Sequence, residues 1–382
     1  MYQLYFAERD TTLYERYPEL NASSDQILDL SKNLAGTRLS ADSPIQGNTY
    51  NSRIIVDFGA QITALTTDVN NSLIPPIGNA EGSASVYLNL RAANAEDLPF
   101  NYTVLAFPVS QSWSSGNGTS SDEPGSKVGA SWFYRDSEDL GTRWDTGSAH
   151  SSGDHSATEM FGGGTWVTGS GYEASQSFSN ETPDIRMNVT DIVEKWVKGD
   201  INNYGFLIKR SKADETGSAM FGKIQFYSTN TNTIYIPRLE VAWDDVDHSG
   251  TGSFDEISSE TYVPYFKNIR NEYREDERAK FRIGVRPEFP VKTYQTQSFY
   301  ITEDRLPVTS FFSIKDAVTE ETIIPFDTTA TKISCDSKGS YFKLRLNTFL
   351  PERHYKIVLK IERDSGDDIQ IHDEGFFFKV VR

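Results

Sequence analysis

An acidic stretch near residue 250 has the residue types and the spacing of a calcium-binding loop. Within the twelve residues 245–256, oxygen ligands would come from a set spaced as in an EF-hand: Asp245, Asp247, Ser249, the Thr251 carbonyl and a bidentate Glu256. Gly250 occupies the position at which that loop turns sharply. The match departs from the motif at Gly252, where an apolar residue is usual, and a predicted strand rather than a helix precedes it. The sequence therefore leaves two alternatives, a calcium site or a solvated acidic linker.

Four tryptophans lie within residues 110–171, a stretch that is otherwise rich in Gly, Ser, Thr and Asp. A flexible linker would not concentrate tryptophan in this way. Exposed indole rings stack on sugar faces, so one interpretation is a glycan-binding surface made by this set: Trp113, Trp132, Trp144 and Trp166. The alternative, which we prefer, is that the rings are buried and hold otherwise polar loops in place.

Other patterns associated with catalysis are weak. The run Phe161-Gly162-Gly163-Gly164-Thr165 lacks the downstream Lys and Ser/Thr of a phosphate-binding loop, so it predicts a loop that passes close to another backbone. The sequence contains no nucleophile elbow and no His-Glu-x-x-His run, and no catalytic pair stands out among 54 acidic residues. We therefore expect a protein that is not an enzyme.

Charge and composition narrow the class of partner. The 382 residues carry a net charge of -17 at pH 7 without a cluster of Lys and Arg, so nucleic acid is not an expected partner. The single cysteine, Cys335, rules out an internal disulfide and a multi-thiolate metal site. No apolar run reaches the roughly 18 residues of a membrane span, and the first ten residues do not resemble a secretory signal. We expect a protein made in a cytoplasm, with calcium as the one candidate cofactor.

The elements that would position these residues are mainly strands. Val189, Val193, Trp196 and Val197 recur at spacings of three and four, which predicts a short helix ending at Gly199. A helix this short persists only when it packs on a larger body. That body is predicted from segments that alternate apolar and polar residues or are rich in β-branched ones: 10–14, 27–31, 52–58, 85–91, 103–109, 185–189, 205–208, 224–228 and 234–243.

These patterns predict an all-β protein of two domains. Residues 1–245 would form a jelly-roll-like antiparallel β-sandwich with a long aromatic loop excursion at 110–171, and residues 246–261 an acidic linker. Residues 262–382 contain further strand-like segments and predict a smaller, Ig-like β-sandwich. Those segments are 280–285, 298–301, 341–346, 355–361 and 375–381.

The order of signals over the first two thirds of the chain resembles the DNRLRE-type β-sandwich family, which is grouped with carbohydrate-binding modules and occurs in surface and secreted proteins. The hexapeptide that names the family is absent, and no sugar-binding residue is carried over from it. The matching elements are Asp10 to Tyr14, Arg53 to Phe58, Val86 to Leu90, Asn188 to Val193 with Trp196 and Gly199, Gly205 to Ile208, Ser228 and Pro237 to Leu239.

The whole chain also resembles virion structural proteins of large tailed phages, particularly cyanophage-type myoviruses, in which a smaller β-domain closes the chain after a β-sandwich. This resemblance implies a structural part of the virion, in its neck, tail or fibre region. Such a part would act through contacts with other virion proteins, as a symmetric homo-oligomer. The alternative function is a glycan-binding module that recognises the host surface.

Overall fold

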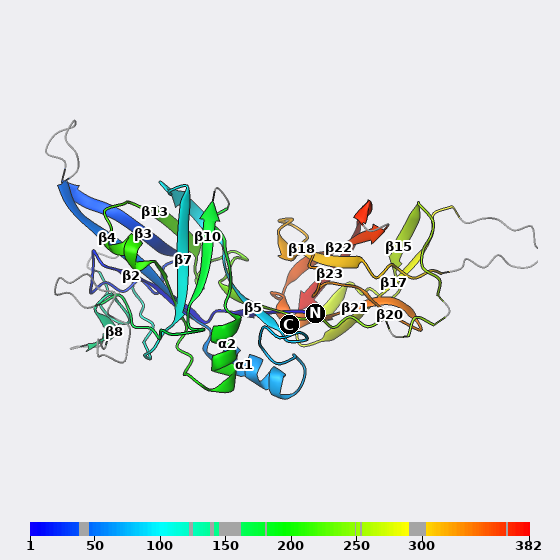
Figure 1. Ribbon diagram of the computed structural model, residues 1–382, viewed down its shortest axis with the longest axis horizontal. Coiled ribbons are helices and arrows are strands. Elements are labelled where there is room, and N and C mark those ends of the chain that lie inside the picture. The colour runs from blue at the N-terminus through cyan, green and yellow to red at the C-terminus, as the bar shows by residue number, and fades with distance from the viewer. Residues whose placement is uncertain are drawn as a thin grey trace, which may run out of the picture. The chain divides into compact units, whose positions relative to one another are not determined.

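A computed structural model describes most of the chain (Figure 1). The described residues are 1–37, 46–121, 125–137, 141–144, 162–179, 182–248, 250–252, 254–289, 303–363 and 366–382. Strands account for 46% of the structure and helices for 9%, in several antiparallel sheets, which confirms the predicted all-β sandwich fold. The chain divides into two compact units, one made of Tyr5–Glu240 and the other of Met1–Leu4 together with Val241–Arg382.

The first unit is built on an eight-stranded sheet in which β12 (Phe206–Arg210) is central and fully buried. Phe206 lies opposite Val56 of β4 on one side and Pro108 of β7 on the other. A strand buried along its whole length needs a run of apolar side chains, which Phe206-Leu207-Ile208 supplies. The other strands of this sheet are β2 (Arg9–Tyr14), β3 (Ile27–Thr37), β4 (Gln46–Asp57), β6 (Ala92–Glu96), β7 (Asn101–Pro108), β10 (Ala174–Ser179) and β13 (Gly222–Tyr227).

A four-stranded sheet has the order β1 (Tyr2–Phe6), β14 (Arg238–Ala242), β5 (Ser85–Leu90) and β11 (Ile185–Asn188). Helix α2 (Thr190–Lys198) follows β11 directly, as its apolar spacing predicted. Trp196 of α2 is 5% exposed, and its ring meets that of Phe206 edge-on at 4.6 Å between centroids. Gly199 ends the helix in the left-handed region, at φ 80°. The helix therefore closes one end of the sandwich core.

Helix α1 (Gly59–Asn70) lies next to α2 (Figure 1) and was not predicted from the sequence. Only Ile62 and Leu65 of its twelve residues are buried, so its apolar stripe is too sparse to reveal a helical period. Its threonines and valine are also poor helix formers, and no side chain caps its first turn. Packing on the sandwich therefore decides that this segment is helical.

The second unit contains a four-stranded and a five-stranded sheet around a core of aromatic rings. The Phe342 ring stacks on Phe312 at 4.1 Å and on Phe281 at 5.2 Å. Its strands are β15 (Tyr262–Phe266), β17 (Arg278–Pro287), β21 (Gly339–Arg345) and β20 (Ser334–Asp336) in one sheet, and β16 (Glu272–Arg274), β23 (Asp368–Val381), β22 (Arg353–Arg363), β18 (Ser310–Asp316) and β19 (Thr322–Ile324) in the other. The strand predicted at 298–301 lies outside the described residues.

The acidic stretch 246–261 runs along this second unit. Ile257 is 3% exposed, and its N–H donates to the Arg305 carbonyl at 3.1 Å. The Arg305 N–H in turn donates to the Asp255 carbonyl at 2.8 Å. These backbone hydrogen bonds fix the stretch to its unit. A solvated linker would not make such contacts.

Candidate functional site

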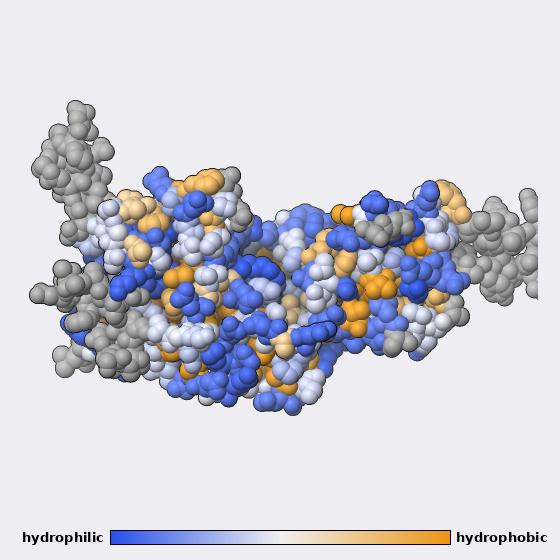
Figure 2. Space-filling model, viewed as in Figure 1, coloured by the Kyte–Doolittle hydropathy of each residue, from blue (hydrophilic) through white to orange (hydrophobic). Residues whose placement is uncertain are grey.

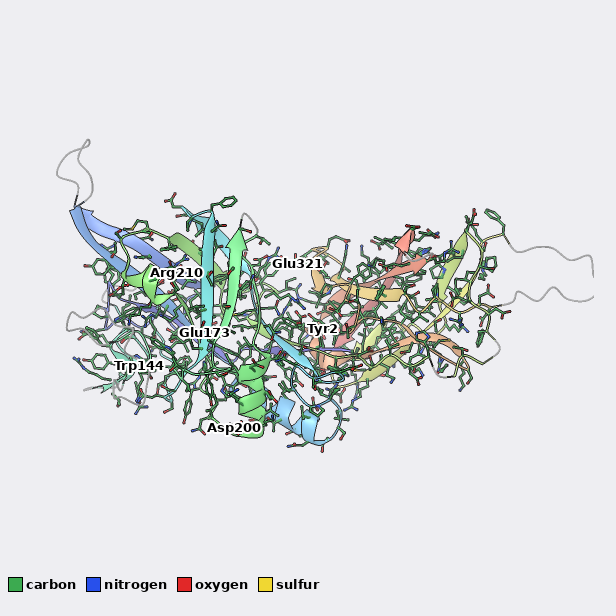
Figure 3. All side chains as sticks on the ribbon, in the orientation of Figure 1. Tyr2, Trp144, Glu173, Asp200, Arg210 and Glu321 are labelled. Carbon is green, nitrogen blue, oxygen red and sulfur yellow. The ribbon has the colours of Figure 1, made fainter. Side chains whose placement is uncertain are left out.

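The four tryptophans of the loop excursion come together in one cluster on the large sheet. Trp113, Trp132, Trp144 and Trp166, which we call the tryptophan cluster, are 0–4% exposed. Trp144 lies among the loops beside β8 (Tyr134–Asp136), as Figure 3 shows. The residues packed against the rings come from strands of the large sheet and the loops: Leu13, Ile55, Phe107, Val109, Ala130 and Leu207.

Two rings of the cluster, those of Trp113 and Trp144, are held by hydrogen bonds as well as by apolar contact. The Trp113 indole N–H donates to the Tyr204 carbonyl at 2.9 Å, and the Arg9 guanidinium lies 4.3 Å from the ring centroid. The Trp144 indole N–H donates to the Ser131 carbonyl, also at 2.9 Å. Such rings fix the loops that carry them, because burial and hydrogen bonding act together.

The burial of these rings bears directly on glycan recognition. With at most 4% of each residue exposed, the ring faces of the tryptophan cluster are covered by the protein's own atoms. Stacking on a sugar requires an open ring face, and in this conformation none of the four offers one. Their positions agree with the alternative that the rings hold polar loops in place.

A buried ion-pair network lies directly under the cluster. The Arg53 guanidinium binds the Glu215 carboxylate through Nε at 3.0 Å and Nη2 at 2.7 Å, and the Lys209 ammonium approaches the same carboxylate at 3.0 Å. The three side chains are 1–4% exposed. Arg53 also lies 5.0 Å from the Trp132 ring and 5.2 Å from the Trp166 ring. Two cations and one carboxylate are thus enclosed between β4, β12, α3 (Lys212–Thr216) and the tryptophans.

Two further buried cations lie near α3. The Lys32 ammonium donates to the carbonyls of Asp214 and Gly217, which form the carboxyl end of this short helix. Arg210, labelled in Figure 3, is 1% exposed and lies 4.9 Å from the Phe221 ring. Burial lowers the pKa of Arg210 to about 10. The α3 carbonyls face the Lys32 charge, whereas Arg210 has the Phe221 ring and one hydrogen bond, from Nη2 to the Phe221 carbonyl at 3.0 Å.

The glycine run fits against this network, as the sequence predicted. A side chain on Gly162 would place its Cβ 2.5 Å from the Trp132 carbonyl oxygen. Gly163 adopts φ 79°, its N–H donates to that carbonyl at 2.6 Å, and its own carbonyl accepts from Arg53 Nη1 at 2.9 Å. Phe161 lies outside the described residues. The run therefore allows a close backbone approach and has no phosphate-binding geometry.

A surface hollow of about 450 Å³ lies beside the excursion and was not predicted from the sequence. Tyr17 is 51% exposed, with the Arg16 guanidinium 5.2 Å from its ring centroid. Lys127 binds Glu19 across the hollow, and this carboxylate raises the pKa of the lysine. The sequence marks Tyr17-Pro18 only as a turn, which gives no sign that the ring is exposed. The lining residues are Arg16, Tyr17, Pro18, Glu19, Leu20, Ser120, Gly125 and Lys127.

Asn21, which follows the lining residue Leu20, is fully buried. Its Nδ2 donates to the Ala130 carbonyl at 2.7 Å, and its Oδ1 accepts from the Gly118 N–H at 3.1 Å. The Phe133 N–H donates to the Pro18 carbonyl at 2.9 Å. The hollow and the tryptophan cluster are therefore joined by one hydrogen-bonded set of loops.

The residues of the candidate calcium loop have protein partners in this structure. The Asp245 carboxylate binds the Met1 ammonium at 2.8 Å, and Glu256 binds Arg305 at 2.8 Å. The Asp247 carbonyl accepts from the Cys335 N–H at 2.9 Å, and the Thr251 carbonyl accepts from the Phe254 N–H at 3.4 Å. Ser249 lies outside the described residues.

The turn of this loop also differs from that of an EF-hand. Gly252, not Gly250, has left-handed backbone angles, with φ 63°. Within the described ranges, no group of three or more His, Cys, Asp or Glu residues is arranged to hold a metal ion. Calcium binding here would have to displace the Met1 ammonium and the Arg305 guanidinium from their carboxylates.

No protein-family model matches the chain, and no curated protein matches it. Among the residues that the structure describes, no helix is long and apolar enough to cross a membrane.

Removal of the Glu215 charge should release the excursion from the sheet. Glu215→Gln leaves Arg53 and Lys209 buried without a counter-charge, which is expected to lower the free energy of unfolding by about 3–5 kcal/mol. Urea unfolding followed by tryptophan fluorescence measures the loss. Glu19→Gln removes the exposed partner of Lys127 and should change stability by less than about 1 kcal/mol. Equal losses in the two variants would show that the buried network does not hold the loops.

Asp10 should make stability depend on pH. This carboxyl is 1% exposed, its Oδ2 accepts from the Thr229 N–H at 2.7 Å, and burial raises its pKa to about 7. Between about pH 4 and 7 the unfolded chain loses this proton while the folded chain keeps it, so the free energy of unfolding falls as pH rises. The fall approaches about 4 kcal/mol, at about 1.4 kcal/mol per pKa unit.

Asp10→Asn should remove this part of the pH dependence, because the amide does not titrate. Urea unfolding at pH 4 and pH 7.5 measures it in the parent and the variant. Asp200→Asn, at an exposed position of the same unit, is the matched control and should follow the parent. Parallel pH profiles for the parent and Asp10→Asn would contradict the assignment.

Proposed function

We propose that this chain is a structural component of a tailed-phage virion, in its neck, tail or fibre region, and that it acts through fixed protein-protein contacts. The observation that carries the proposal is the burial of the tryptophan cluster, which fixes the described loops of the polar excursion, at 110–121, 125–137, 141–144 and 162–171, as a preformed surface. The resemblance of the whole chain to virion structural proteins supports the placement in a phage particle.

Preformed loops suit a part that must assemble in one geometry. Association orders side chains and loops, and a surface that is already fixed loses less entropy on binding. Here the apolar rings face inward, and Arg53, Lys209 and Glu215 tie the loops to β4 and β12. The exposed side chains of the described loops at 114–121 and 125–127 are mostly polar, and polar groups suit the rim of an interface. Repetition of the chain as a symmetric homo-oligomer follows from the symmetry of virion rings.

Quantitative mass spectrometry of purified particles from the phage that carries this gene tests the proposal. The chain should be present in a copy number that matches the symmetry of a ring or cluster in the particle, measured against a virion protein of known copy number. A virion part is retained after the particles are purified on a density gradient. Absence of the chain from such particles would rule out a structural role.

A second candidate function is recognition of a host-surface glycan, and the hollow at Tyr17 favours it. This ring is half exposed in a hollow of about 450 Å³ that also carries the charged side chains of Arg16, Glu19 and Lys127. An exposed aromatic ring with polar groups around it can stack on a sugar and bind its hydroxyls. The hollow, rather than the four buried tryptophans, would then be the glycan site.

Tyr17→Ala should abolish retention on host polysaccharide if the hollow binds glycan. The expected loss is at least about tenfold in affinity, because removal of the ring removes its stacking surface. Affinity electrophoresis in gels that contain the polysaccharide measures it. Phe100→Ala removes a ring elsewhere in the same unit that is more exposed, at 68% against 51% for Tyr17, and should leave retention unchanged. Unretarded migration of the parent protein would exclude this function.

A further inference from the structure

Strand β23 of the second unit has an open edge along most of its length. On one side β22 pairs with it from Asp368 to Val380. On the other side β16 pairs only with its end, from Lys379 to Val381. No strand of the described chain pairs with residues 368–377 on that second side. Such an edge presents unpaired backbone N–H and C=O groups to any extended segment that can reach it.

Three large apolar side chains lie along this edge on the outer face of the sheet. Ile369, Ile371 and Phe377 lie opposite residues Glu362, Lys360 and Lys356 of β22, and they are 54%, 62% and 49% exposed. The face of the molecule shown in Figure 2 is mainly hydrophilic, with small apolar areas. Three exposed apolar residues on one face of one strand are therefore a concentrated feature of this surface.

The inner face of the same strand packs in the core at its carboxyl end. Phe378 is 1% exposed and packs against the rings of Tyr273, Phe281 and Tyr355. Phe376 lies 4.7 Å from Phe266. Inward and outward side chains alternate along the strand, as expected for a sheet. The exposed apolar residues therefore belong to the outer face, and a shift of register does not account for their exposure.

A bulge divides the edge into two parts. The register with β22 shifts between Ile357 and Leu359, and Gly375 adopts φ 75° at this point. Residues 368–372 form a regular ladder before the bulge, and Phe377 follows it on the same face. A docked segment would pair with the regular part and pack its last apolar side chain near Phe377.

The charge around the edge selects the kind of occupant. Residues 366–378 contain four acidic side chains and no Lys or Arg: Asp367, Asp368, Asp373 and Glu374. Arg363 and Lys356 of β22 bind Asp368 and Asp373, which leaves an excess of negative charge. A second copy of this chain would bring the same acidic residues to the same edge, and like charges opposed across strands are destabilising.

We infer that the open edge of β23 docks an extended segment of a different protein, with apolar residues at alternate positions and Lys or Arg at its ends. Backbone hydrogen bonds to residues 368–372 add the segment to the sheet as a further strand. Ile369, Ile371 and Phe377 bind its apolar side chains, and the acidic residues bind its basic ends. The inference concerns the second unit and does not depend on the assignment to a phage particle.

Two synthetic peptides test the inference on the full chain. One alternates Val and Thr between lysine-rich ends, and the other carries Glu in place of Lys. Isothermal titration calorimetry should show binding of the Lys-ended peptide to the parent and no binding of the Glu-ended one. The double variant Ile369→Ser with Ile371→Ser should weaken binding at least about tenfold, and Phe377→Ser should weaken it independently.

Val318→Ser is the matched control, because Val318 is 83% exposed in the turn after β18 of the same unit. It should bind the Lys-ended peptide like the parent, and circular dichroism melting should show all variants folded. Binding that is unchanged in both edge variants, or absent in the parent, overturns the inference. A dimer in analytical ultracentrifugation that the double variant abolishes would assign the edge to a second copy and also overturn it.

Discussion

The loop surface of the first unit depends on one constraint, the enclosure of the Glu215 carboxylate between two cations beneath tryptophan rings. An unpaired charge in such an environment would be strongly destabilising, so the buried carboxylate must be paired with positive charge and hydrogen-bonded. Arg53 does so with two parallel hydrogen bonds, and Lys209 binds the second oxygen from β12. Because the partners come from different elements, the network fixes β4, β12, α3 and the glycine loop relative to one another.

This arrangement explains how the described loops of a stretch rich in Gly, Ser and Asp are held on the large sheet. Polar loops bury too little apolar surface to fold by themselves, but the tryptophan cluster supplies that surface from within the same loops. The hollow beside Tyr17 shares this support through Asn21 and Pro18. A surface fixed in this way can present the same contacts in every copy, which suits both an assembly part and a shallow ligand site.

The second unit presents a different kind of surface. Its core of stacked phenylalanines holds two sheets together, while β23 leaves part of its backbone and an apolar row uncovered. Natural proteins usually protect such edges with charge or with bulges, and β23 has both. The acidic residues therefore have two effects, since they oppose pairing between copies and attract a basic segment.

The sequence by itself determined the fold class, because strand alternation and the three-and-four spacing of α2 are local patterns that follow from backbone geometry. The glycine run at 162–164 was interpreted correctly for the same reason, since it signals a close backbone approach.

Other features depended on partners distant in the chain. Tertiary packing decided that 59–70 is helical, that the four tryptophans face inward, and that Asp245 and Glu256 bind Met1 and Arg305. The hollow arises where residues 16–20 meet Ser120, Gly125 and Lys127. Burial and ion pairing depend on contacts between segments that are distant in the chain. The type and spacing of residues therefore indicated the alternatives for the tryptophans and the acidic loop, but could not select between them.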